Sequence, residues 1–296
     1  MRYLIVILLL QLFLKANSVG DYRATALCVR YNNSDYFAIR SLSFNGKKAF
    51  LIVDTDSLHT GLVKQEETQV LTCDNNVFNS KYFKLLGLEK GLKHRLQNDG
   101  ITATNGGIIV TTDLCPSSKR GFEKRLYQTL IDNFKNPVPV TIFITKRWIH
   151  KHLNAFKKLK SWQQEGKLDI VWGNHTAEHR YNKDTPIDHN FVLLARENLA
   201  KDVLDLEKEL LKRGVLPSVF FRFPGLVSDK KSVNIVIRLG LIIVGTNSWL
   251  AKGESLKENS IILVHGNKNE AKGVDILLKL IKERKIKAVK SIRVLL

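Results

Sequence analysis

The chain changes character near residue 104, where short apolar strands begin to alternate with amphipathic helical segments. The predicted strands cover residues 106–113, 138–145, 168–174, 218–223, 241–247 and 260–266. The predicted helices cover residues 124–134, 148–166, 191–214, 230–240 and 273–285. Repeated strand–helix alternation is typical of crossover connections between parallel strands, so the sequence predicts an α/β fold with a parallel sheet or a (β/α) barrel. In such folds the chemistry takes place at the carboxyl ends of the strands.

Residues 19–103 follow a different pattern, with short strands and turns and no catalytic constellation. Strands are expected over residues 26–31, 36–44 and 47–56, and a short helix over residues 80–92. Asn45-Gly46 between two of these strands is a hairpin signal. We therefore divide the chain into a strand-rich accessory region, residues 19–103, and an α/β domain, residues 104–296.

The first 18 residues have the composition of a secretory signal peptide. Arg2 precedes an apolar run over residues 3–14, and small residues follow at Ala16-Asn17-Ser18. A spanning helix needs about 20 apolar residues, so this run is short for one, although an uncleaved anchor stays open as the alternative. Both alternatives predict an exported protein, periplasmic or secreted. Cys28 and Cys73 are then candidates for a disulfide in an oxidising compartment, and Cys115 is left over.

The charge of the chain is strongly basic and unevenly distributed. The net charge is +19, and residues 104–296 carry 34 Lys and Arg against 19 acidic residues. Such a surface favours anionic partners, here an anionic cell-envelope polymer, while an ordinary solvated surface stays open as the alternative. The sequence has no helix-turn-helix, zinc-finger or aromatic RNA-binding pattern, so nucleic acid is not a predicted partner. A stable protein partner is not predicted either.

Polar side chains stand at the ends of four predicted strands. Asp113 ends the first, His175 follows the third, Arg222 lies late in the fourth, and His265 ends the last. Because the carboxyl ends of parallel strands share one rim, these groups are expected to converge. A carboxylate, imidazoles and a fixed cation are the groups that a metallohydrolase uses.

The segment His175-Thr176-Ala177-Glu178-His179 is the sharpest local signal. Two histidines four residues apart can share a metal such as zinc, and two surface histidines are the alternative. The string also reads H-x-x-E-H, the inverted zinc-protease motif. That motif requires a long helix, whereas here a strand precedes it and Pro186 follows soon after, which argues against a protease.

Residues 104–296 resemble the polysaccharide deacetylase family, the NodB-like carbohydrate esterases. The resemblance rests on ordered motifs rather than on any one of them. The matching segments are residues 111–116 for T-F-D-D-G-P, 175–179 for H-[ST]-x-x-H, 222–224 for R-x-P, 263–265 for L-x-H and, in part, 246–249 for D-x-x-W.

The resemblance implies a distorted (β/α) barrel that removes acetyl groups from an N-acetylhexosamine polysaccharide, peptidoglycan or chitin-like. It implies that His175 and His179 hold a divalent metal, with zinc expected. It assigns the base to Asp113, the orientation of that base to Arg222 and the general acid to His265. It also implies substrate contacts from the backbone near Gly225 and Leu226 and from the Trp249 ring.

Leu114 departs from the family pattern, because the second Asp of the first motif is a metal ligand and leucine cannot coordinate. Three explanations stay open: a two-histidine site completed by water, a ligand from elsewhere, or a non-catalytic relative. The last would be a carbohydrate-binding or envelope-associated protein on a degenerate deacetylase scaffold. Retention of Asp113, Arg222 and His265 favours activity.

Overall fold

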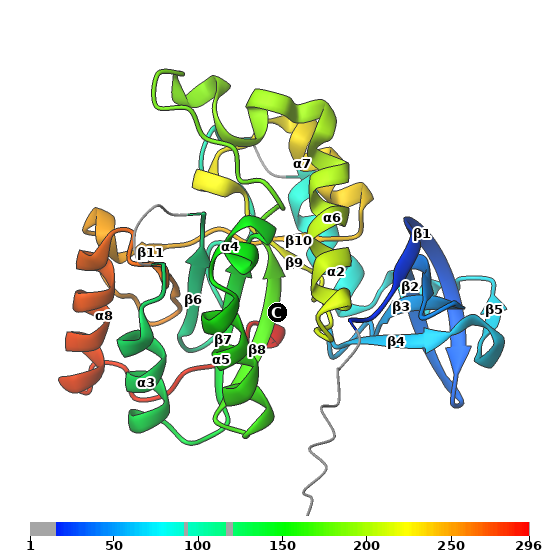
Figure 1. Ribbon diagram of the computed structural model, residues 1–296, viewed down its shortest axis with the longest axis horizontal. Coiled ribbons are helices and arrows are strands. Elements are labelled where there is room, and N and C mark those ends of the chain that lie inside the picture. The colour runs from blue at the N-terminus through cyan, green and yellow to red at the C-terminus, as the bar shows by residue number, and fades with distance from the viewer. Residues whose placement is uncertain (1–15, 92–93, 117–120, 296) are drawn as a thin grey trace, which may run out of the picture.

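The computed structural model describes residues 16–91, 94–116 and 121–295 and contains two sheets, with helices α2 (Lys81–Gly91) and α6 (Leu199–Lys212) between them (Figure 1). The N-terminal sheet is antiparallel, with strand order β4-β3-β2-β1-β5. Its strands are β1 (Val19–Tyr31), β2 (Ser34–Phe44), β3 (Lys47–Val53), β4 (Thr60–Lys64) and β5 (Gln69–Leu71). The predicted hairpin joins β2 to β3, and Asn45 and Gly46 both have positive φ there, as a tight two-residue hairpin turn requires.

The second sheet is parallel throughout, with strand order β10-β9-β8-β7-β6-β12-β11. Its strands are β6 (Ile109–Leu114), β7 (Val138–Ile144), β8 (Leu168–Asn174), β9 (Phe220–Phe221), β10 (Ile242–Ile243), β11 (Ser248–Trp249) and β12 (Ile261–His265). The sheet curls into an incomplete barrel. Ile101 bridges to Val244 beside one edge strand and Ala103 bridges to Ser260 towards the other, so the segment before β6 lies across the opening. The predicted class, a distorted (β/α) barrel after a strand-rich region, is confirmed.

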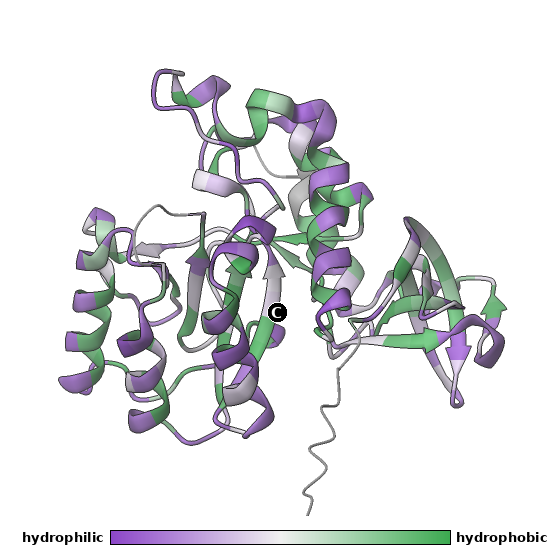
Figure 2. Cartoon of the chain, viewed as in Figure 1, coloured by the Kyte–Doolittle hydropathy of each residue, from purple (hydrophilic) through white to green (hydrophobic). Residues whose placement is uncertain are grey.

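The helices of the α/β part pack mainly against the outer face of this sheet. They are α3 (Lys124–Asn133), α4 (Lys146–Lys151), α5 (Leu153–Gln164), α7 (Lys230–Arg238) and α8 (Ala271–Lys282), together with α6. Short helices elsewhere are α1 (Asn75–Phe78), η1 (Gln65–Glu67), η2 (Ile187–His189), η3 (Phe191–Asn198), η4 (Pro224–Leu226), η5 (Leu250–Lys252) and η6 (Ile292–Val294). Figure 2 shows apolar residues along the parallel strands and polar residues on the outward helix surfaces, the division expected of this layering.

Two predicted helices differ from the structure. The helix expected over residues 191–214 begins only at Leu199, because residues 191–198 form a 3₁₀ segment in which Ala195 has non-helical backbone angles. The helix expected over residues 148–166 is divided at His152 into α4 and α5. In both cases the helical apolar spacing continues across backbone that is not α-helical, which is residues 191–198 in the first case and His152 in the second.

Strand alternation decides which residues of β6 face the inside of the barrel. Val110 and Leu114 belong to the outer core, which the sheet shares with α3, α5 and α8. Ile109 belongs to the second core, which includes residues of α2 and of the N-terminal sheet. Because side chains alternate along a strand, Asp113 points inward while Leu114 packs in the outer core.

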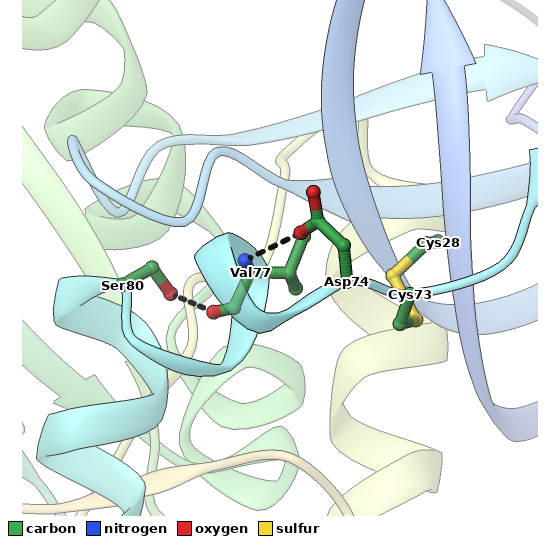
Figure 3. The surroundings of a disulfide bond; sticks show 5 residues. All are labelled: Cys28, Cys73, Asp74, Val77 and Ser80. Atoms are coloured by element: carbon green, nitrogen blue, oxygen red, sulfur yellow. Dashed lines mark hydrogen bonds between the residues drawn. A yellow bond between two sulfur atoms is a disulfide. The ribbon is translucent and has the colours of Figure 1, made fainter.

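The N-terminal sheet is attached to the rest of the molecule by the shared apolar core and by polar contacts, and a disulfide ties β1 to the segment that follows β5. Arg40 of β2 forms a fully buried ion pair with Glu207 of α6. A disulfide joins Cys28 in β1 to Cys73, next to Asp74, which caps α1 (Figure 3). The predicted signal peptide lies mostly outside the described residues. Within the described part of the chain, no helix combines the length and apolar character that a membrane span requires.

Candidate active site

A pocket of about 1040 Å³ opens at the carboxyl ends of the parallel strands. It is lined by residues that come from distant parts of the sequence, which include Asp113, Cys115, His179, Gly225, Leu226, Trp249, His265 and Glu270. Six of the eight predicted site residues therefore line one pocket. The other two, Arg222 and His175, lie directly behind the wall and are fully buried.

Arg222 holds Asp113 in position. Its Nη1 donates to Asp113 Oδ1 at 2.9 Å and to Thr111 Oγ1 at 2.7 Å, while Nη2 and Nε donate to backbone carbonyls of residues 245 and 244. Burial is the largest single influence on the pKa of Asp113 and would raise it. The charges of Arg222, His175 and His265 and the hydrogen bond from Arg222 together outweigh burial and lower that pKa. The carboxylate is therefore ionised and able to accept a proton.

His175 and His179 lie side by side with their ring centroids 4.9 Å apart. Nδ1 of His175 lies 2.8 Å from the carbonyl oxygen of Arg222, which can only accept, so Nδ1 carries the proton and Nε2 presents a lone pair. Nε2 of His179 is buried and has no hydrogen-bond partner among the residues described. Burial lowers the pKa of both rings, that of His179 to about 3, so both are neutral, the form that binds metals.

The loop after β8 directs both rings towards the pocket. Asn174 ends the strand, and its Oδ1 accepts from the Thr176 amide at 2.9 Å. The Thr176 hydroxyl in turn accepts from the His179 amide at 3.0 Å. Thr176 and His179 both have positive φ, which no α-helix contains. The backbone thus agrees with the argument against the inverted zinc-protease motif.

Cys115 lies beside the histidines, although the sequence analysis assigned it no role. Its Sγ is 3.6 Å from His175 Nε2, and ligand atoms of Cys115, His175 and His179 all lie within 4.8 Å of one another. Burial raises the pKa of this thiol well above its usual range, and the charge of Asp113 adds to the effect. The adjacent Leu114 is fully buried in the outer core and faces away.

His265 has an acidic neighbour that sequence reasoning also missed. Glu270 Oε2 lies 3.1 Å from His265 Nδ1, an ion-pair distance without hydrogen-bond alignment, and accepts from Trp249 Nε1 at 2.8 Å. Burial alone would raise the pKa of Glu270, but His265, Trp249 and the charge of Lys252 together outweigh it and lower the pKa to about 2. Glu270 has a left-handed backbone with φ 47°, an unusual conformation that places its carboxylate between the imidazole and the indole.

Gly225 and Leu226 also line the pocket. The Leu226 amide donates to the Phe223 carbonyl at 2.9 Å, so Gly225 is the better candidate for an oxyanion donor. Gly225 has φ 63°, and a Cβ there would lie 2.5 Å from the Phe191 ring. Glycine is therefore required by both backbone and space.

Comparison with known proteins shows which family model and which solved structures this chain is similar to. Residues 101–244 match the model of the polysaccharide deacetylase family. The structure is similar to a family 4 carbohydrate esterase from Bacillus anthracis, with 19% identity, 72% of this chain and 90% of that chain covered, and a TM-score of 0.49.

Two further solved structures are similar at lower scores. The chitin deacetylase of the fungal pathogen Colletotrichum lindemuthianum has 18% identity and a TM-score of 0.44, with 65% of this chain and 88% of that chain covered. A CE4 family pseudoenzyme from Bacillus anthracis has 14% identity and a TM-score of 0.45, with 66% and 68% covered.

Proposed function

We propose that the protein is a metal-dependent hydrolase that removes N-acetyl groups from an N-acetylhexosamine polysaccharide of the peptidoglycan or chitin type. The observation that carries the proposal is the constellation around the pocket: an ionised Asp113 held by Arg222, two neutral imidazoles, and His265. A base, metal-binding nitrogens and a second acid/base group are the parts that amide hydrolysis needs.

The histidine pair fits a divalent metal. The buried, unpartnered Nε2 of His179 and the fixed tautomer of His175 are what metal ligation requires of two imidazoles. We assign zinc to this position on the basis of its preference for imidazole. Bound there, the metal would supply Lewis-acid polarisation of the amide carbonyl and a more acidic water.

The residues of the chain have separate roles in the proposed reaction. Asp113 accepts the proton of the attacking water, and Arg222 keeps its carboxylate ionised and oriented. His265 donates a proton to the leaving amine, with Glu270 close enough to stabilise the protonated imidazole. The Gly225 amide is the proposed donor to the oxyanion, and the Trp249 ring is one wall of the sugar pocket.

The proposed setting is the cell envelope. The N-terminal signal and the Cys28–Cys73 disulfide support an exported protein, periplasmic or secreted, cleaved near Ser18 or held by an uncleaved anchor. N-terminal sequencing of the exported protein checks this, and an intact Met1 on cytoplasmic protein would contradict it. The net charge of +19 supports attraction to an anionic envelope polymer, which should weaken steeply as salt rises.

Acetate release from N-acetylglucosamine oligomers and from peptidoglycan tests the proposed activity. Asp113→Asn should lower turnover by about 100-fold or more, the usual effect of losing a general base. Asp169→Asn is the matched control, because Asp169 lies at the amino end of β8, opposite to the strand ends that line the pocket, and accepts a hydrogen bond from Arg293. Oligomer binding without acetate release by the wild type would instead favour the non-catalytic carbohydrate-binding protein.

A further inference from the structure

Leu114 supplies no metal ligand, and its place in the fold is unfavourable for a carboxylate that could act as one. Leu114 is fully buried among apolar residues of the outer core, on the face of β6 opposite to Asp113. Its backbone carbonyl accepts from the buried hydroxyl of Thr145 at 3.0 Å, which fixes the end of the strand. A carboxylate in this position would lie in an apolar environment, at a substantial cost in stability.

The next residue, Cys115, ends the strand and lies among the imidazoles. Its Sγ and His175 Nε2 are 3.6 Å apart. In a tetrahedral zinc site with Zn–S of about 2.3 Å and Zn–N of about 2.0–2.1 Å, sulfur and nitrogen ligands lie roughly 3.6 Å apart. With His179 included, all three donor atoms lie within 4.8 Å of one another. The spacing therefore fits three ligands of one ion.

The surroundings of these donors support the same arrangement. Nδ1 of His175 donates its hydrogen to the Arg222 carbonyl, so the nitrogen of the ring that faces the Cys115 sulfur is Nε2, which carries a lone pair. The Cys115 carbonyl accepts from the buried side chain of Asn267 at 2.8 Å, which holds the residue in place. Asp113 Oδ2 is also 3.6 Å from His175 Nε2. We do not count Asp113 as the third ligand, because Arg222 holds its Oδ1 and the proposed function assigns this carboxylate to proton transfer.

We propose that Cys115 is the third protein ligand of the metal, in place of the carboxylate that Leu114 does not supply. The ligand set is then one thiolate and two imidazoles, and the thiol proton is released to solvent when the metal binds. A thiolate carries the same single negative charge as a carboxylate but is softer, so the site should prefer zinc to magnesium or manganese. Three protein ligands and one open position are the arrangement of a catalytic zinc site.

This proposal requires the metal site of the proposed function, but it does not require that the protein catalyses the proposed hydrolysis. A simple S–H···N hydrogen bond between Cys115 and His175 would have the same 3.6 Å separation, so the experiment must distinguish ligation from hydrogen bonding. Cys115 is the single free thiol of the chain, since the other two of its three cysteines form the disulfide. A spectroscopic signal of metal–thiolate bonding can therefore come from one residue only.

The purified protein is stripped of metal with a chelator and titrated with cobalt(II). The wild type should develop a near-ultraviolet thiolate-to-cobalt charge-transfer band, which zinc abolishes by displacement and magnesium does not. Cys115→Ser should lose the band and bind cobalt about 100-fold more weakly or worse. Losing a group that merely hydrogen-bonds to a metal ligand already lowers metal affinity by about 10–100-fold, and loss of the ligand itself should cost at least as much. Cys115→Asp should bind cobalt without the band, and it decides the question if the serine variant fails to fold.

His189→Ala is the control for stray binding, because His189 is an exposed imidazole whose Nδ1 pairs with Asp188. It should leave both the band and the affinity unchanged. The proposal is overturned if folded wild type binds no cobalt, if it binds without a charge-transfer band, or if Cys115→Ser binds as tightly. A band without acetate release would leave the ligand assignment standing and remove the proposed hydrolase. Acetate release without a band would leave the proposed hydrolase standing and remove the assignment of Cys115 as a ligand.

Discussion

Arg40 and Glu207 form an ion pair without solvent exposure where the N-terminal sheet meets α6. Nε and Nη2 of Arg40 donate to the two carboxylate oxygens at 2.6 and 2.8 Å, and Nη1 donates to the carbonyls of Ile39 and Leu239. Tyr22 also donates to Glu207, at 2.9 Å. The two partners are 167 residues apart in sequence. Replacing Arg40 by methionine keeps much of the side-chain volume and removes every hydrogen bond that the guanidinium donates.

We predict that Arg40→Met lowers the free energy of unfolding by about 3–5 kcal/mol, because it leaves a carboxylate buried without its partner. This is a large share of the roughly 5–15 kcal/mol that stabilises an ordinary domain. Arg30→Met is a matched control on the same sheet, since Arg30 makes the same two-bonded contact with Asp35, at 2.7 and 3.0 Å. Both of those side chains are 48% exposed, so this change should cost only about 0–1 kcal/mol.

Urea unfolding of the wild type and the two single variants measures the difference that burial makes. A double variant, Arg40→Met with Glu207→Leu, should recover much of the lost stability, because no charge then stays buried alone. The reasoning is refuted if Arg40→Met is within about 1 kcal/mol of Arg30→Met, the range of an exposed pair. It is also refuted if the double variant is less stable than Arg40→Met alone.

Three further changes test other parts of the structure. Serine at both Cys28 and Cys73 should lower the free energy of unfolding by about 4 kcal/mol, because the disulfide spans 45 residues; an unchanged urea midpoint would contradict this. Gly225→Ala should lower acetate release, since its Cβ would displace an aromatic wall of the pocket. Gly46→Ala, equally left-handed but with open space around it, should leave activity unchanged. Glu270→Gln should cost about 1–2 kcal/mol at neutral pH. Because folding lowers the pKa of Glu270 to about 2, that difference should shrink in urea titrations from about pH 5 downwards, and a constant difference would argue against it.

The sequence by itself determined the features that depend on neighbouring residues. Strand–helix alternation is read from local hydrophobic period, and it predicted the parallel sheet and therefore a common rim for Asp113 and His265. The hairpin at Asn45-Gly46 follows in the same way from residues that tolerate positive φ. The chemical roles of the residues at the rim stay predictions that the proposed experiments test.

Other features were decided only by the tertiary structure. Cys115 stands where the first matched motif has glycine, and Glu270 lies outside the matched motifs, so neither has a local signal for its position in the site. Only the folded chain brings Cys115 to His175 and Glu270 to His265. The late start of α6 at Leu199 is equally invisible in a sequence whose apolar spacing continues through residues 191–198. Local periodicity records which face of a segment is apolar. Distances between side chains far apart in sequence depend on how those segments pack, which no short stretch of the chain contains.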